Sequence, residues 1–221
     1  QETFKEFRER TGHTILERYG MTETGMNTSN PYDGERRGGT VGLPLPGISV
    51  RVAGPDDAAL PPGEIGRIQV RGPNVMAGYW RMPERNAEEF TADGFFRTGD
   101  LGRLDSDDYL SIVGREKDLV ISGGYNIYPK EIEMVLEELP GVTEAAAFGV
   151  PHADFGEALM AAIVAKPGAA LTEEGVIAHV KARLANFKVP KRVFFVPELP
   201  RNTMGKVLKN ELRSTYGAKK P

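Results

Sequence analysis

The chain has 221 residues, 40% of them hydrophobic, so it can bury the core of one large or two small domains. It has no cysteine and only three scattered histidines, which excludes disulfides, thiolate metal sites and a cysteine nucleophile and disfavours a histidine metal site. The net charge is −3, and no apolar run approaches the roughly 20 residues of a membrane span, so we expect a cytoplasmic protein without membrane contact.

The chain opens with a predicted helix over residues 1–12, in which Phe4 and Phe7 lie three residues apart among charged side chains. The first residue is Gln1 rather than methionine, and the pattern is that of a helix entered midway, so we expect a fragment of a longer protein. The short apolar-rich run from Ile15 to Tyr19 then predicts a strand that leads into a loop tip.

Residues 38–100 are predicted to contain only strands and turns. Apolar residues alternate with polar ones over residues 48–52 and 68–70, and Pro-Pro-Gly and Asp-Gly sequences between them favour turns. Residues 104–113 are typical of a hairpin. This part of the chain is therefore expected to be a small antiparallel or barrel-like unit.

The pattern changes after residue 117. Pro129 stands at a plausible first helical position, and apolar residues of one face follow it until the Pro-Gly pair at 140–141. The remaining predicted elements are strands over 142–150 and 158–165, a helix capped by Thr172 and a strand over 192–196. This order describes an α+β domain of about 100 residues. We place the domain boundary at Lys117, giving domains over 1–116 and 117–221.

The charge is distributed unevenly. Residues 181–221 carry eleven Lys or Arg against Glu198 and Glu211, which leaves −12 for the preceding residues. Stacking aromatics do not alternate with the basic residues and no nucleic-acid-binding motif accompanies them, so we expect no nucleic-acid partner. Phosphate groups of a small ligand fit this segment better, although a solvated basic face explains most of the charges with any ligand.

Four short sequences carry the candidate chemistry: Tyr19-Gly20-Met21-Thr22-Glu23, Phe96-Arg97-Thr98-Gly99-Asp100, Gly114-Arg115-Glu116-Lys117-Asp118 and Pro200-Arg201-Asn202-Thr203-Met204-Gly205-Lys206. Attaching a carboxylate to a phosphate requires neutralisation of ATP, a divalent ion, a grip on ribose and a cation near the attacking oxygen. These residue types fit that task, but composition and spacing alone do not assign roles.

Together the four sequences resemble those of the AMP-forming acyl-CoA synthetases, a superfamily that also contains peptide-synthetase adenylation domains and firefly-type luciferases. The resemblance covers essentially the whole chain. It implies an α+β fold in which residues 1–116 are the last part of the large AMP-binding domain and residues 117–221 are a small mobile domain. It also implies ATP, coenzyme A and a carboxylic acid as substrates and Mg²⁺ as cofactor.

The resemblance implies a nucleotide site formed by residues 19–22 with Asp100, Arg115 and Lys206. Tyr19 is expected against the adenine, and Thr22 at the α-phosphate. Glu23 is expected to bind Mg²⁺, Asp100 the ribose hydroxyls, and Arg115 ribose or phosphate. The alternatives are a core aromatic at Tyr19, a solvated carboxylate at Glu23 and a structural ion pair between Asp100 and an arginine.

In the family the small domain adopts two poses, and Lys117 occupies the hinge position, although it could be an ordinary exposed lysine. In one pose Lys206 is expected to stabilise the forming acyl-adenylate. In the other, Ser122-Gly123-Gly124-Tyr125-Asn126 lines a channel for coenzyme A, unless the two glycines serve only a turn. The resemblance also implies control by acetylation of Lys206, which would remove its charge, with a lysine acetyltransferase and a deacetylase as expected partners.

Within the superfamily, the sequence over residues 22–32 and 39–47 is most similar to that of malonyl-CoA synthetases. The resemblance therefore implies malonate as the acid, with methylmalonate as the alternative. Met26 is expected to line the acyl pocket, or else to be a packing residue. Arg18 could pair with a distal carboxylate but cannot be placed. The phosphate-gripping loop that the family carries earlier is absent, so the chain alone is expected to be inactive, and its partner is the missing N-terminal part.

Two departures from the family pattern and three rivals accompany this prediction. Phe96 replaces the commoner tyrosine, and Asp107-Asp108-Tyr109 replaces Asp-Gly-Tyr, which predicts a looser turn. The rivals are an amino-acid adenylation domain that loads a carrier protein, a luciferase-like oxygenase and a non-enzymatic module that binds AMP or coenzyme A.

Overall fold

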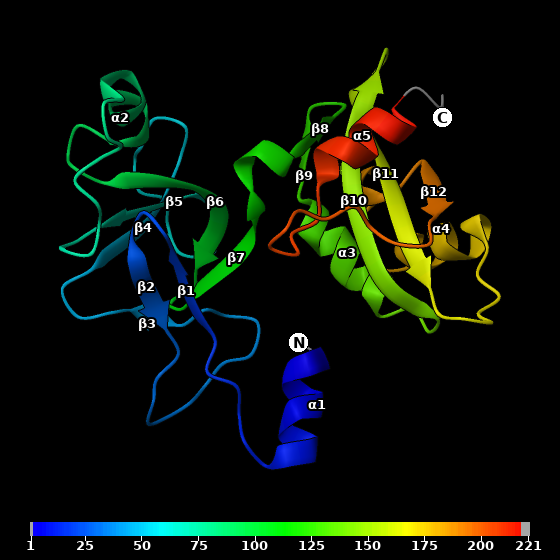
Figure 1. The fold of residues 1–221 in the computed structure, drawn as a ribbon, viewed down its shortest axis with the longest axis horizontal. Helices are drawn as coiled ribbons and strands as arrows, with labels where there is room; N and C mark the ends of the chain where they lie inside the picture. The colour runs from blue at the N-terminus through cyan, green and yellow to red at the C-terminus, as the bar shows by residue number, and fades with distance from the viewer. Residues whose placement is uncertain (1, 218–221) are drawn as a thin grey trace. The chain divides into compact units, whose positions relative to one another are not determined.

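The computed structural model describes residues 2–217 and divides after Glu116 into two compact units (Figure 1). Gln1 and the end of the basic segment, including Lys219 and Lys220, lie outside the described residues. No helix among the described residues is long and apolar enough to cross a membrane.

The first unit consists mainly of antiparallel strands. Its elements are α1 (Glu2–Thr11), β1 (Arg18–Met21), β2 (Gly25–Ser29), β3 (Leu43–Pro44), β4 (Ser49–Ala53), β5 (Gly66–Arg71), α2 (Pro83–Glu89), β6 (Phe96–Leu104) and β7 (Leu110–Arg115). Strands β1, β2 and β3 form one sheet, and β4, β5, β6 and β7 form a second sheet in that order. All of these pairings are antiparallel, as predicted.

Two predictions for the first unit need correction. The strand expected over residues 15–19 begins at Arg18 and continues to Met21. Residues 83–89 form a helix, α2, where only strands and turns were predicted. This helix has Pro83 in its first turn but buries no residue. Its sequence therefore lacks the regularly spaced apolar residues from which a helix is predicted.

The hairpin between β6 and β7 confirms the prediction for residues 104–113, but its turn is not loose. Asp108 adopts a left-handed conformation with φ 64°, the region that favours glycine and that Asp tolerates better than most residues. The Asp105 carboxylate accepts hydrogen bonds from the backbone amides of Asp107 and Tyr109, both at 2.9 Å. These bonds close the turn without the usual glycine.

The second unit is a sheet with helices on both faces. Its elements after the short 3-10 helix η1 (Glu116–Asp118) are β8 (Val120–Ser122), β9 (Tyr125–Ile127), α3 (Pro129–Glu137), β10 (Val142–His152), β11 (Gly156–Ala165), α4 (Glu173–Lys181), η2 (Asn186–Lys188), β12 (Arg192–Phe195) and α5 (Lys209–Tyr216). β11 pairs antiparallel with β10 and β8 and parallel with β12, and β9 continues the sheet beyond β8.

Alternation along β10 and β11 divides the core of the second unit between the two faces of the sheet. Ala147 and Ile163 point to the side of α3 and α4, whereas Phe148 and Met160 point to the side of α5. Thr172 caps α4 as predicted, because its hydroxyl accepts a 3.1 Å hydrogen bond from the Gly175 amide. The predicted order of elements is confirmed, and β8, β9 and α5 are additions to it.

Candidate active site

Asp100 lies at the centre of a buried cluster in the first unit. The Tyr19 hydroxyl donates a 2.6 Å hydrogen bond to Asp100 Oδ2, and Arg115 Nε lies 3.3 Å from Asp100 Oδ1. Register explains the second contact, because Asp100 of β6 and Arg115 of β7 are directly opposed across the ladder. Three of the four predicted sequences therefore meet at one carboxylate.

Burial and charge define the state of this cluster. Tyr19 and Asp100 are 7% and 6% exposed, whereas 44% of the Arg115 side chain is exposed. Burial, and then the charge of Asp100, raises the pKa of Tyr19 above its ordinary value, so its hydroxyl is a proton donor. Both sequence alternatives are thus partly realised: Tyr19 is a core aromatic, and Asp100 pairs with an arginine. A carboxylate has about four acceptor positions, so these contacts leave capacity for ribose hydroxyls.

The hairpin of β1 and β2 presents Thr22 and Glu23 at its tip. A bulge interrupts the pairing between Tyr19 and Gly20, and a Cβ on Gly20 would lie 2.1 Å from the Gly25 carbonyl oxygen, so this position requires glycine. Thr22 is exposed and Glu23 is half-buried. The tip therefore offers a hydroxyl and a carboxylate from a rigid hairpin.

The Glu23 carboxylate has a partner that the sequence did not reveal. Tyr79 Oη donates to Glu23 Oε1 at 3.1 Å, and burial, followed by this contact, raises the pKa of Tyr79. Within residues 2–217 no group of three His, Cys, Asp or Glu side chains could hold a metal ion. A single carboxylate fits Mg²⁺, which proteins usually bind through one or two carboxylates together with substrate phosphates.

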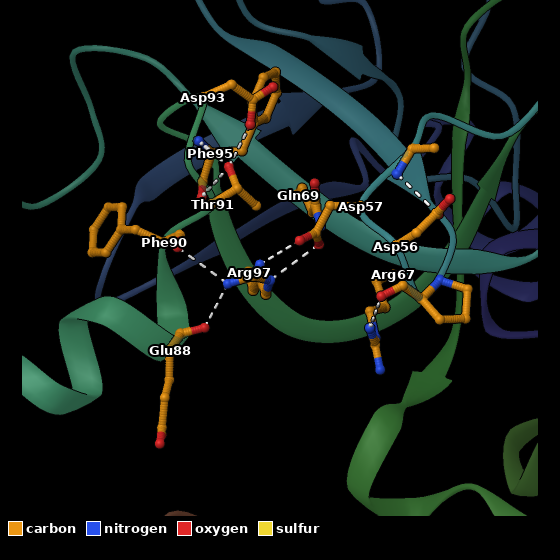
Figure 2. Close-up of polar contacts among 12 residues, drawn as sticks. Asp56, Asp57, Arg67, Gln69, Glu88, Phe90, Thr91, Asp93, Phe95 and Arg97 are labelled. Atoms are coloured by element: carbon orange, nitrogen blue, oxygen red, sulfur yellow. Dashed lines mark hydrogen bonds and ion pairs between the residues drawn. The ribbon is translucent and has the colours of Figure 1, made fainter.

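Arg97 belongs to a predicted site sequence but serves the fold of the first unit. Figure 2 shows its guanidinium between Asp57 and two backbone carbonyls. It pairs with the Asp57 carboxylate and donates to the carbonyl oxygens of Glu88, at 2.6 Å, and Phe90, at 3.2 Å. Because these carbonyls lie at the end of α2, Arg97 anchors that helix.

In the second unit, Lys206 lies exposed on a closed loop between β12 and α5. The Asn202 side-chain oxygen accepts hydrogen bonds from the amides of Met204, at 3.0 Å, and Lys206, at 2.9 Å. The Asn202 amide donates in turn to the Lys206 carbonyl oxygen at 2.9 Å. Gly205 has φ 78°, which the sharp turn requires.

Two ion pairs hold the ends of this loop. Arg201 pairs with Glu144 at 2.6 Å and also donates to the Gly205 carbonyl oxygen at 2.5 Å. At the start of α5, Lys209 pairs with Glu133 of α3 at 2.6 Å, and both of these side chains are mostly buried. The backbone that carries Lys206 is therefore fixed to the sheet and to α3.

Gly123 and Gly124 form the two-residue turn of the β8–β9 hairpin. Their φ angles are 57° and 81°, and positive values at both central residues define the type I′ turn, which favours glycine. Tyr125 follows, 56% exposed, with its ring stacked on Phe187 at 4.4 Å between centroids. A turn thus accounts for both glycines, and apart from its two chain neighbours a Cβ on Gly124 would meet no atom of the described residues within 4 Å.

The other predicted residues lie on exposed positions of their own unit. Met26, on β2, is 43% exposed, and Arg18, at the start of β1, is exposed too. Lys117 lies in η1, at the division between the units.

Two family descriptions match the chain: AMP-binding enzyme over residues 1–80 and AMP-binding enzyme C-terminal domain over residues 131–206. The malonate–CoA ligase of Arabidopsis thaliana is 42% identical in an alignment of 216 residues that covers 93% of this chain and 35% of that protein. A long-chain-fatty-acid–CoA ligase of Escherichia coli is 43% identical over 204 residues, which are 92% of this chain and 36% of that protein. The chain thus spans about a third of the length of these relatives.

Among solved structures, ATP-bound MatB from Rhodopseudomonas palustris matches with a TM-score of 0.95 and 58% identity, over 98% of this chain and 43% of that one. These findings confirm the resemblance to CoA ligases and the predicted fold class.

Proposed function

The chain belongs to the AMP-binding enzymes, and we propose that the whole protein is an ATP-dependent acid–thiol ligase that makes acyl-coenzyme A through an acyl-AMP. The contact of Asp100 with Tyr19 and Arg115 carries the proposal, because it joins three of the predicted sequences at a preorganised carboxylate. Since the chain spans about a third of the length of its relatives, we propose that it acts with an N-terminal portion of the same protein. We also propose that the whole protein works in the cytoplasm.

In the first half-reaction, a carboxylate oxygen of the acid attacks the α-phosphorus of ATP, and pyrophosphate leaves as the acyl–O–P bond forms. Asp100 accepts from the ribose hydroxyls, Arg115 donates to ribose or phosphate, and Thr22 donates to the α-phosphate. Mg²⁺ at Glu23 would supply neutralisation of the phosphate charge. The exposed Lys206 ammonium stabilises the charge between carboxylate and phosphate.

Tyr19 also contributes to this nucleotide site, together with the backbone of Gly20 and Met21. Its hydroxyl is engaged by Asp100, so we assign its ring, rather than its polar end, to the adenine.

In the second half-reaction, the thiol of coenzyme A attacks the acyl carbon, and AMP leaves. A cation held against the acyl group would obstruct the thiol, so we propose that the unit beginning at Lys117 changes pose about that residue. Gly123, Gly124 and Tyr125 then line the passage. Acetylation of Lys206 by an acetyltransferase, reversed by a deacetylase, would switch off the first half-reaction only.

Malonate is the proposed acid, with methylmalonate the alternative. Identity to the named relatives does not choose between acids, because the malonate ligase and the long-chain ligase are equally similar to this chain, at 42% and 43%. Support comes from the sequence around Met26, whose half-exposed side chain would limit the size of the acyl group.

The test is pyrophosphate release by the whole protein with ATP, coenzyme A and a series of acids. Malonate is expected to give the highest kcat/KM. Activity with only fatty or aromatic acids would overturn the choice of malonate, and an absence of acid-dependent pyrophosphate release would overturn the ligase assignment itself.

A further inference from the structure

Residues 74–79 clamp the backbone of the β1–β2 hairpin. The side-chain amide nitrogen of Asn74, Nδ2, donates to the backbone carbonyl oxygens of Thr24, at 2.6 Å, and Met26, at 3.2 Å. The Met76 amide donates to the Glu23 carbonyl oxygen at 2.9 Å. The backbone from Glu23 to Met26 is thus fixed from outside the hairpin.

Tyr79, at the end of this segment, is itself held by α2. The Asn86 side chain accepts from the Tyr79 amide at 2.7 Å and donates to its carbonyl oxygen at 3.1 Å. The Arg85 guanidinium lies 3.9 Å from the centre of the Tyr79 ring, a cation–π contact. The backbone and ring of Tyr79 are therefore positioned without its hydroxyl, which remains available to Glu23.

At its other end, α2 is anchored by Arg97 through the carbonyl oxygens of Glu88 and Phe90. A connected set of contacts thus leads from the Phe96–Asp100 sequence through α2 and Tyr79 to Glu23. The helix that the sequence did not predict is the element that connects two predicted site sequences.

From this geometry we infer that Tyr79 is a positioning residue for Glu23, holding its carboxylate ready for the metal–nucleotide complex through the 3.1 Å hydrogen bond. The inference rests on the proposed function, in which Glu23 holds Mg²⁺. A phenol suits the task because it is a neutral donor: it restricts the carboxylate without neutralising the charge that attracts a cation, as Lys or Arg would.

The test uses the whole protein with Tyr79→Phe, which removes the hydroxyl and keeps the ring over which Arg85 lies. Pyrophosphate release is measured at saturating ATP and acid against free Mg²⁺, and ATP affinity is measured by calorimetry with and without Mg²⁺. We expect the half-saturating Mg²⁺ concentration to rise about tenfold, in the range seen for lost partners of metal ligands. ATP affinity should fall in Mg²⁺ only, and Tyr32→Phe, at a tyrosine that is 82% exposed, should change neither.

Two further variants separate the outcomes. If Glu23→Gln raises the half-saturating Mg²⁺ concentration and Tyr79→Phe leaves it unchanged, the inference is overturned while the proposed function stands. If Glu23→Gln has no effect on Mg²⁺ dependence, the metal role of Glu23 fails, and the inference fails with it. Should Tyr79→Phe not fold, Asn86→Ala, which releases the Tyr79 backbone but keeps its hydroxyl, is expected to shift the Mg²⁺ curve in the same direction, and an unshifted curve would contradict the inference.

Discussion

Tyr19 and Asp100 lie 81 residues apart in sequence, and the hydroxyl of the first donates a 2.6 Å hydrogen bond to the carboxylate of the second. Both residues are almost fully buried, and the Tyr19 hydroxyl gives the Asp100 carboxylate a second polar partner beside Arg115. The bond fixes the β1–β2 hairpin, which carries Thr22 and Glu23, to the strand that carries Asp100.

Tyr19→Phe is expected to lower the free energy of unfolding by about 1–3 kcal/mol, because it removes a donor from a buried carboxylate. It should also raise KM for ATP, since Asp100 becomes free to turn. Urea denaturation and pyrophosphate release measure the two effects. Unchanged values of both would mean that the Tyr19–Asp100 bond is dispensable.

The same pair predicts a pH dependence. The pKa of Tyr19 is raised in the folded protein above the ordinary value of about 10, so the folded state holds this proton more tightly than the unfolded chain. The stabilisation is therefore complete below about pH 10 and is lost as the pH rises toward the folded pKa, by at most about 1.4 kcal/mol per pH unit. Denaturation between about pH 9 and 11 should show a shallower decline for Tyr19→Phe than for the parent protein. Parallel declines would contradict the raised pKa.

Lys209→Met is expected to destabilise the protein by about 3 kcal/mol, because it removes the buried cation that lies 2.6 Å from the mostly buried Glu133 carboxylate. Lys130→Met is the matched control. Lys130 lies 4.0 Å from the same carboxylate but is 49% exposed, so its loss should change stability by no more than about 0.5 kcal/mol. Equal losses of stability in the two variants would show that burial of the Lys209–Glu133 pair does not increase its contribution to stability.

Arg201→Ala is expected to slow acyl-AMP formation with little loss of stability. Its pair with Glu144 is about 40% exposed on both sides, and such pairs contribute about 0–1 kcal/mol. However, Arg201 also bonds to the Gly205 carbonyl oxygen beside Lys206, so its loss should loosen the Lys206 loop. Adenylation and urea denaturation of Arg201→Ala, Glu144→Gln and the double variant form a cycle. If the effects of Arg201→Ala and Glu144→Gln on the adenylation rate simply add in the double variant, the two residues do not hold the Lys206 loop together.

Gly124→Leu and Gly124→Asn separate the two explanations of Gly124. The turn needs positive φ, which Asn tolerates far better than Leu, whereas a passage for coenzyme A is narrowed by either side chain. We expect Gly124→Asn to keep most of the stability and still slow thioester formation. Full thioesterification by Gly124→Asn would leave the turn as the only role of this glycine.

The sequence predicted those elements whose burial leaves a regular pattern. Ile132 and Leu136 mark the buried face of α3, and the continuous apolar runs of β10 and β11 reflect strands covered on both faces. Helix α2 escaped prediction because no residue in it is buried, and β8 and β9 because three residues are too few to show a period.

The family resemblance singled out candidate site residues by their motifs, and their roles stay predictions, whereas partners from elsewhere in the chain gave no signal in the sequence. Asp100 and Glu23 could be singled out from their motifs, but Tyr79 gave no signal, since its role depends on α2 and on the path of residues 74–79. Arg97 illustrates the reverse case, because it lies inside a predicted site sequence that gave it no role, and the structure pairs it with Asp57 and the end of α2.

The central claim is that the charge of Lys206 serves the first half-reaction only, and the two half-reactions of Lys206→Ala in the whole protein test it most directly. The rate of acyl-AMP formation, measured as pyrophosphate release, is expected to fall by a factor on the order of 10² to 10³, the usual loss when one stabilising group is removed. Thioester formation from supplied acyl-AMP and coenzyme A should proceed at the parent rate. An equal loss in both half-reactions, or undiminished acyl-AMP formation, would contradict the account.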